Sequence, residues 1–180
     1  ITISADIESA SISNPGLNEA ALDGQSVTIT LSNETFADLV LDPGNFTLNN
    51  APGGLTIESF TSVTTTTAIV NLAFTPGDFD GNYANFSISI DPLELTQTSD
   101  LDLTTNEITI TALIESATMS DPSLNESTLD NQSVIINLTN ETFDDPLEAG
   151  NFTLINFPTG LSIESVTRNS ATAAEVFLAF

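Results

Sequence analysis

The feature that most constrains this 180-residue chain is a long internal repeat. Residues 1–38 align without a gap with residues 108–145, and after a one-residue deletion residues 45–74 align with residues 151–180. The first pair of segments has 25 identical positions and the second has 18, so 43 of 68 aligned positions match. The offset gives a unit of about 107 residues, which is the size of one domain. The chain is therefore expected to hold one copy of this unit and most of a second.

The repeat also predicts where one unit ends and the next begins. The segment 108–112 reads ITITA and is expected to be the closing strand of the first copy. This assigns residues 6–112 to unit 1 and residues 113–180 to an incomplete unit 2 without its last two strands. Residues 1–5 would be the last strand of a preceding repeat. The second copy stops at Phe180, so either the sequence is cut there or a neighbour supplies the closing segment.

Comparison of the two copies indicates which residues are buried. Apolar residues recur at alternate positions: Val70, Leu72 and Phe74 correspond to Val176, Leu178 and Phe180. The residues between them change freely, since Ile69 becomes Glu175 and Asn71 becomes Phe177. A period of two with one invariant apolar face is typical of a half-buried β-strand.

Gly, Pro and Asn-rich turn signals separate the alternating segments, and no segment has the period of a helix. Strands are expected near 6–12, 25–32, 45–50, 55–63, 67–75, 84–91 and 104–111. Seven short strands rich in Thr, Val and Ile, in about 100 residues, are typical of an immunoglobulin-like sandwich. The sequence therefore predicts an all-β chain of tandem immunoglobulin-like β-sandwich repeats, with about seven strands per unit.

The charge excludes several classes of partner. The chain has 25 acidic residues, Arg168 as its one basic residue, and a net charge of −24. Nucleic acids and anionic lipids bind through Lys and Arg, so neither is expected as a partner. No apolar run is long enough to cross a membrane, so this segment is not expected to insert into one.

The absence of three residue types also restricts catalysis. Without Cys and His the chain has no thiolate nucleophile and no imidazole base, and without Lys it cannot form a Lys–Asn crosslink. A pair of carboxylates, as in glycosidases, is the main remaining option. Most acidic positions recur in both copies, and an active site is seldom duplicated along a repeat. We therefore expect no enzymatic activity.

Three segments resemble a known group of proteins. They are LNEAALDGQSVTITLSNETF at 17–36, NFTLNNAPGGLTIESF at 45–60 and LAFTPGDFDGNYANFSISI at 72–90. They look like the tandem immunoglobulin-like repeat domains of large bacterial cell-surface adhesins and extracellular filament proteins. The resemblance implies an extracellular or cell-surface location and a role as a stalk. The implied partners are neighbouring repeats of the same chain and other copies in a filament.

A calcium site is expected in the turn after the fifth strand. Asp78, Asp80 and Asn82 offer oxygen ligands at alternate positions, with a Gly before Asn82, as at the start of a calcium loop. Asp144 and Asp145 of unit 2 are expected to face this turn, so that a shared Ca²⁺ would stiffen the joint between units. The alternative is a solvated Asp–Gly turn without a metal.

Four Asn-x-Ser/Thr sequons in predicted turns are candidates for glycosylation: Asn33, Asn45, Asn140 and Asn151. The alternative is that these Asn residues serve the turns themselves, because Asn adopts turn conformations readily.

Two functions from different classes fit these observations. The first is a structural spacer in an adhesin stalk or filament, in which each unit adds length and the acidic surface keeps chains apart. The second is an adhesive module that binds a glycan or a protein through its loops. Exposed aromatic residues would mark such a module, and the candidates are Tyr83 and Phe157.

Overall fold

The computed structural model describes residues 6–13, 15–75, 77–96, 101–120 and 123–180. Within these residues the chain is all-β, with 44% of residues in strands and no helix of seven residues or more. The strands form three antiparallel sheets in the described part of the chain. The prediction of an all-β protein is confirmed. Among the same residues, no helix has the length and apolarity needed to cross a membrane.

The chain folds into two compact units, Ile1–Leu113 and Ile114–Phe180, which are described separately. This division follows contacts within the fold, whereas the boundary after residue 112 was inferred from the repeat and stays a prediction. The proposed strand of a preceding repeat, residues 1–5, lies outside the described residues.

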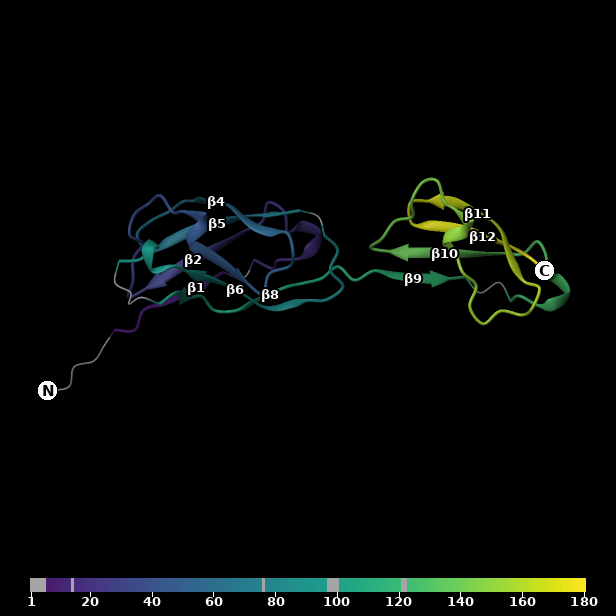
Figure 1. Ribbon diagram of the computed structural model, residues 1–180, viewed down its shortest axis with the longest axis horizontal. Coiled ribbons are helices and arrows are strands. Elements are labelled where there is room, and N and C mark those ends of the chain that lie inside the picture. The colour runs from purple at the N-terminus through teal and green to yellow at the C-terminus, as the bar shows by residue number, and fades with distance from the viewer. Residues whose placement is uncertain (1–5, 14, 76, 97–100, 121–122) are drawn as a thin grey trace. The chain divides into compact units, whose positions relative to one another are not determined.

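The first sheet of unit 1 has the order β1-β2-β5-β4, with β1 Ser9–Ile12, β2 Ser26–Ser32, β4 Leu55–Thr61 and β5 Thr67–Phe74 (Figure 1). Alternate residues of β5 are buried along its whole length, as the period of two predicts. Strands β4 and β5 pair in register except at a bulge between Ile57 and Ser59. One face of this sheet therefore consists of apolar side chains.

The second sheet of unit 1 covers that face. It consists of β3 Phe46–Asn49, β6 Tyr83–Ile90 and β7 Leu103–Thr104, with β8 Ile108–Ile110 also paired to β6. Phe86, Ile88 and Ile90 of β6 are fully buried, and they belong to one hydrophobic cluster with residues of β2 and β5. A single core therefore lies between the two sheets, and β6 is its central strand on the second side.

The last predicted strand of unit 1 differs from expectation. Residues 104–111 were expected to form one strand, but the structure has two short strands, β7 and β8, on either side of residues 105–107. Thr105 is buried, and its hydroxyl accepts a hydrogen bond from the backbone N–H of Ile88 at 3.0 Å. Asn106 Oδ1 accepts from the backbone N–H of Ile12, in the other sheet, at 2.8 Å. These side-chain hydrogen bonds replace strand pairing at the break.

Unit 2 has one sheet in its described residues, with strand order β9-β10-β12-β11. The strands are β9 Ser116–Met119, β10 Ser133–Thr139, β11 Ser162–Ser170 and β12 Ala173–Ala179. The order matches that of β1, β2, β5 and β4, and so does the register: Ser9 pairs with Ser32, and the aligned Ser116 pairs with Thr139. A small cluster of Leu129, Val134, Val176 and Leu178 is its buried core.

Short 3₁₀ turns connect the strands. They are η1 Glu19–Ala21, η2 Pro43–Asn45 and η3 Pro92–Glu94 in unit 1, and η4 Glu126–Thr128 and η5 Ala149–Asn151 in unit 2. Asp42 and Asp91 precede η2 and η3 and accept hydrogen bonds from backbone N–H groups of these turns. Each Asp-Pro pair therefore begins a 3₁₀ turn, one before β3 and the other after β6.

Candidate functional site

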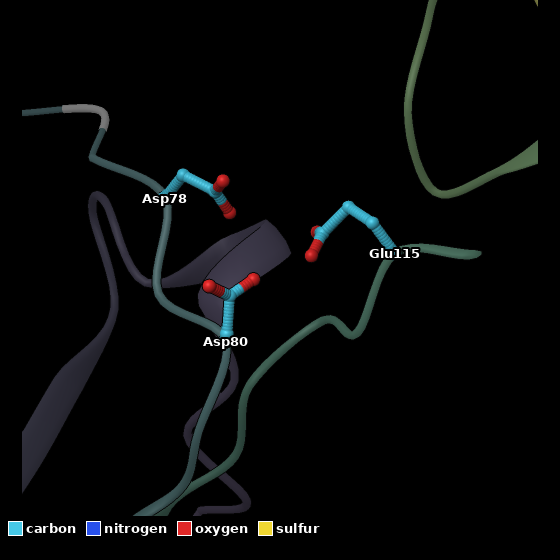
Figure 2. A group of neighbouring side chains, drawn as sticks. All are labelled: Asp78, Asp80 and Glu115. Atoms are coloured by element: carbon cyan, nitrogen blue, oxygen red, sulfur yellow. The ribbon is translucent and has the colours of Figure 1, made fainter. Parts of the chain in front are cut away.

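The predicted calcium turn lies between β5 and β6 of unit 1. Its acidic side chains, Asp78 and Asp80, are exposed and project from neighbouring positions of the loop (Figure 2). Figure 2 also draws Glu115, which belongs to unit 2. Glu115 was not among the predicted ligands, because in the sequence it appears only as the repeat partner of Glu8, and both side chains are half-buried. The residue types present are hard oxygen donors of the kind that Ca²⁺ binds.

Asn82, the third predicted ligand of this turn, has a structural role. Its side-chain Oδ1 accepts a hydrogen bond from the backbone N–H of Ala112 at 2.9 Å. The carbonyl oxygen is therefore already used to hold the end of unit 1 against the loop. The contribution of Asn82 to a metal site stays a prediction, and this contact competes with it.

Asp144 and Asp145, the ligands predicted from unit 2, lie in the connection after β10 and are exposed. Asp145 forms an ion pair with Arg168 of β11, with 3.6 Å between Oδ2 and Nη1. Arg168 also donates from Nε to the carbonyl oxygen of Phe143 at 3.2 Å. The one basic residue of the chain therefore stabilises this connection, and a role of the two aspartates in calcium binding stays a prediction.

Three of the four sequon residues use the amide nitrogen to which a glycan would be attached. Asn33 and Asn140 both have positive φ and donate from Nδ2 to the backbone carbonyls of Ile7 and Ile114, at 3.0 and 2.9 Å. Asn45 donates from Nδ2 to Glu94 Oε1 at 2.7 Å and is half-buried. Asn151 is exposed at the end of η5. The geometry therefore favours Asn151 among the four candidates for glycosylation.

The aromatic residues considered for an adhesive module have different environments. Tyr83 is half-buried at the edge of the unit 1 core, where its ring packs edge-on against Phe79 with 5.3 Å between centroids. Phe157 lies in the connection between η5 and β11 and is 49% exposed. Only Phe157 has the exposure expected of a residue that contacts a ligand.

Two buried carboxylates in unit 1 were not anticipated. Glu34 Oε1 accepts from the backbone N–H groups of Thr35 and Thr96, at 2.7 and 3.1 Å, and from the Thr96 hydroxyl. Glu94 Oε1 accepts from the backbone N–H of Asp42 at 3.1 Å as well as from Asn45. Neither has a basic partner in these contacts, and burial is compensated by hydrogen-bond donors. The hydrogen bonds of Glu34 and Glu94 connect the β2–β3 loop to η3 and the residues after it. These contacts link the two sheets.

The chain enters and leaves unit 1 at opposite ends of β2. At the entry, Asn33, which follows β2, holds the backbone of Ile7. At the exit, Thr111 donates its N–H to the Leu17 carbonyl at 3.0 Å and accepts from the Glu19 N–H at 2.9 Å. Glu19 Oε2 then accepts from the N–H of Leu113 at 2.8 Å. The turn that contains Glu19 leads directly into the start of β2, so the two attachment points are separated by the length of this strand.

No protein-family model matches the chain, and a comparison with curated proteins finds no match.

Proposed function

We propose that the chain is a structural spacer, built of tandem immunoglobulin-like sandwiches, in the stalk of a cell-surface adhesin or in an extracellular filament. The observation that carries the proposal is the path of the chain through unit 1, which enters beside Ile7 and leaves beside Leu113 at the other end of β2. Seven strand residues span about 23 Å at ~3.3 Å each. A unit arranged in this way adds its length to the distance between its neighbours.

The exit contacts suit a unit that transmits tension. Residues 17–19 run parallel to the segment around Thr111, with Asn18 and Thr111 as the bridge partners. Tension between the entry and the exit acts along these segments. The backbone hydrogen bonds of Thr111 and the hydrogen bond from Leu113 to Glu19 therefore bear the force together rather than one after another. Glu19 also accepts from the backbone N–H of Phe79 at 3.0 Å, so it links the exit to the β5–β6 loop.

The composition supports the same proposal. A net charge of −24 repels other copies and favours solubility, and a single basic residue leaves one trypsin cleavage site. The proposed location is extracellular, with neighbouring repeats and other copies of the chain as partners. The proposal includes no catalytic role, since the acidic residues of one copy mostly recur in the other.

Single-molecule force spectroscopy of the full chain, held at its two ends, tests the spacer function. We expect unit 1 to unfold in one step that releases about 34 nm, which is ~37 nm of extended chain for ~105 residues at ~3.5 Å each, less the ~2.3 nm that β2 already spans. Glu19→Ala removes the acceptor for Phe79 and Leu113 and is expected to lower the unfolding force. Glu58→Ala, at an exposed carboxylate of β4, is the matched control and leaves the force unchanged. Gradual extension of the wild-type chain without a force step would contradict the proposal.

The exposure of Phe157 favours one alternative, an adhesive module that binds a glycan or a protein through this loop. A glycan array probed with the wild-type chain and with Phe157→Ala distinguishes the two functions. Binding that disappears with Phe157→Ala would support the adhesive module, whereas no binding by either protein supports the spacer.

A further inference from the structure

The side of unit 1 between β3 and β4 is hollowed along the edges of both sheets. β4 is the edge strand of the first sheet on this side, and β3 is the edge strand of the second. A hollow of about 490 Å³ lies here, and its lining includes Phe46 and Leu48 of β3 and Leu55 and Ile57 of β4. All four side chains belong to the core of unit 1 or pack against it. Apolar residues of both sheets therefore line one hollow on this side.

A second hollow adjoins the first, since Pro43 contributes to the lining of both. It has a volume of about 310 Å³. Leu39 and Val40 of the β2–β3 connection form one wall, and Phe60 and Val63 form the other. Leu39 and Val40 are 57% and 84% exposed, so folding of unit 1 gains little from them. Neighbouring exposed apolar residues beside a hollow are typical of an interaction surface.

The apolar wall of the second hollow is not shared by the other copy of the repeat. Residues 39–44 read LVLDPG, whereas the corresponding residues 146–150 read PLEAG. Val63 aligns with Asn169, and Phe60 aligns with the smaller Val166. Overall the copies match at 43 of 68 aligned positions, so most residues that the strands require are kept. A wall that served the fold alone would be expected in both copies, so this one indicates a role for the surface of unit 1.

The second hollow also has a carboxylate at its rim. The register of β4 against β5 shifts between Ile57 and Ser59, and Glu58 is the extra residue of this bulge. A bulge takes a side chain out of the alternation of its strand, and Glu58 is exposed and lines the second hollow. A bulge and a charge on an edge strand both disfavour the addition of a further strand. A ligand on this side is therefore held by its side chains rather than by extension of the sheet.

Two more exposed carboxylates flank the apolar wall of residues 39–41. Asp38 Oδ1 accepts a hydrogen bond from the backbone N–H of Val40 at 2.6 Å, and Asp42 Oδ1 accepts from that of Gly44 at 2.9 Å. These bonds fix the carboxylates on either side of the wall. The second hollow is therefore an apolar site with negative charge around it.

The charge of the chain decides what kind of partner fits this site. The chain has one basic residue, Arg168, which pairs with Asp145 in unit 2. The acidic groups around the hollow therefore have no basic side chain of unit 1 to pair with. A second copy, with a net charge of −24, is repelled. Charge complementarity favours a different protein that supplies a Lys or Arg.

We infer that this side of unit 1 binds an extended segment of another protein in which a Lys or Arg lies between two apolar residues. Thr56 lines the first hollow and Phe60 the second, and four residues of a strand span about 13 Å at ~3.3 Å each. Residues i and i+4 of an extended segment have the same separation and share one face with residue i+2, which faces Glu58. The segment therefore reads apolar-x-basic-x-apolar. The inference goes beyond the spacer function and does not depend on it.

The test adds the peptide SLTRTLS to the ¹⁵N-labelled full chain and follows binding by NMR. Its side chains read the same in both directions, so its orientation along β4 does not matter. We expect a saturable 1:1 change in the amide signals of residues 39–41, Thr56, Phe60 and Val63. The peptide SLTETLS, which reverses the charge, and the peptide SSTRTSS, which lacks both apolar residues, are each expected to bind at least about tenfold more weakly.

Variants of the chain separate the two parts of the site. The double variant Leu39→Ser/Val40→Ser changes only exposed side chains and is expected to weaken binding of SLTRTLS at least about fivefold. Glu58→Gln is expected to weaken it about threefold, as for an exposed ion pair. The matched control is Glu164→Gln, which lies at the same bulge position in unit 2, is exposed and should leave binding unchanged.

Three results would overturn the inference. The first is the absence of a saturable change at up to about 5 mM SLTRTLS, well above the Kd expected of a specific site. The second is equal binding of SLTRTLS and either control peptide, which would remove the need for the charge or for the apolar residues. The third is equal weakening by Glu58→Gln and Glu164→Gln, which would mean that the peptide responds only to the net charge of the chain.

Discussion

The two units of this chain present nearly the same sheet in two different environments. Strand order and register agree, and matched hydrogen bonds have the same length: the N–H of Leu31 donates to the Thr66 carbonyl, and that of Leu138 to the Thr172 carbonyl, each at 2.8 Å. Burial does not agree, since Phe74 is 7% exposed and the aligned Phe180 is 47% exposed. Local sequence is therefore sufficient for the first sheet, whereas the closed core requires the segment that contains β6.

The largest expected effect comes from a matched pair of core substitutions. Leu17→Ala in unit 1 is expected to lower the free energy of unfolding by about 3 kcal/mol, because it leaves a cavity in a closed core. Leu124→Ala in unit 2 removes a side chain already 40% exposed and is expected to cost less than about 1 kcal/mol. Tyr83 is the only Tyr and the chain has no Trp, so its fluorescence during urea unfolding reports on unit 1. Amide exchange in β10 reports on unit 2, and equal losses in both units would contradict the comparison.

A second pair concerns the buried carboxylate of unit 1. Glu34→Ala empties a buried site and removes an acceptor for the backbone N–H groups of Thr35 and Thr96, at an expected cost of about 2 kcal/mol. Its aligned partner Glu141 is exposed and accepts from the neighbouring Thr142 at 2.5 Å, so Glu141→Ala is expected to cost less than about 0.5 kcal/mol. Urea unfolding of both variants measures the difference. If Glu141→Ala lowered the free energy of unfolding as much as Glu34→Ala, the contribution of this carboxylate to stability would not depend on the second sheet.

A third pair should give equal effects. Asn33 and Asn140 have φ values of 58° and 62° and make the same hydrogen bond to the chain entering their units. Alanine at either position is expected to cost about 1 kcal/mol, because it loses this bond and strains the left-handed backbone. Glycine at either position also loses the side-chain hydrogen bond, but it adopts the positive φ without strain. The glycine controls should therefore cost less stability than alanine. Tyr83 fluorescence and β10 amide exchange measure the two units, and a clear inequality would mean that the open face also weakens the first sheet.

The smallest expected effect is that of calcium. A module with a Kd near 1 mM gains only about 0.4 kcal/mol at 1 mM Ca²⁺, which raises the melting temperature of unit 1 by roughly 2–3 °C. The double variant Asp78→Asn/Asp80→Asn is expected to remove this gain, while Asp38→Asn, elsewhere in unit 1, keeps it. Thermal melts with calcium and with EDTA provide the measurement. An equal shift in the double variant would place any bound calcium elsewhere.

The sequence predicts a large part of the fold because strand burial leaves a period of two that survives comparison of the copies. The strands around Val27 and Val70 follow directly from that pattern. The break between β7 and β8 was not predicted, because it depends on hydrogen bonds from Thr105 and Asn106 to residues far away in the chain. The absence of a strand at 152–155 was not predicted either, since the same Phe-Thr-Leu sequence forms most of β3 where β6 lies beside it.

The candidate site was less predictable than the fold. Acidic turns can be found from composition, and Asp78 and Asp80 are indeed exposed on one loop. The sequence does not reveal that Asn82 is used by the backbone of Ala112, or that Asp145 pairs with Arg168. It also gives no sign that Glu34 and Glu94 are buried, because their neighbours are polar and their hydrogen-bond donors come from other loops. Contacts between distant segments decide these roles.

Hydrogen exchange at matched backbone amides is the most direct test of the claim that one sheet is closed and its counterpart open. Leu31 and Leu138 donate hydrogen bonds of 2.8 Å to aligned acceptors, and Leu72 and Leu178 do the same. Measured in one sample of the full chain, the unit 1 amides are expected to exchange at least about 100 times more slowly, because their exchange requires opening of the two-sheet core. Equal rates within each pair would contradict the account, since the second sheet would then add no stability to the first.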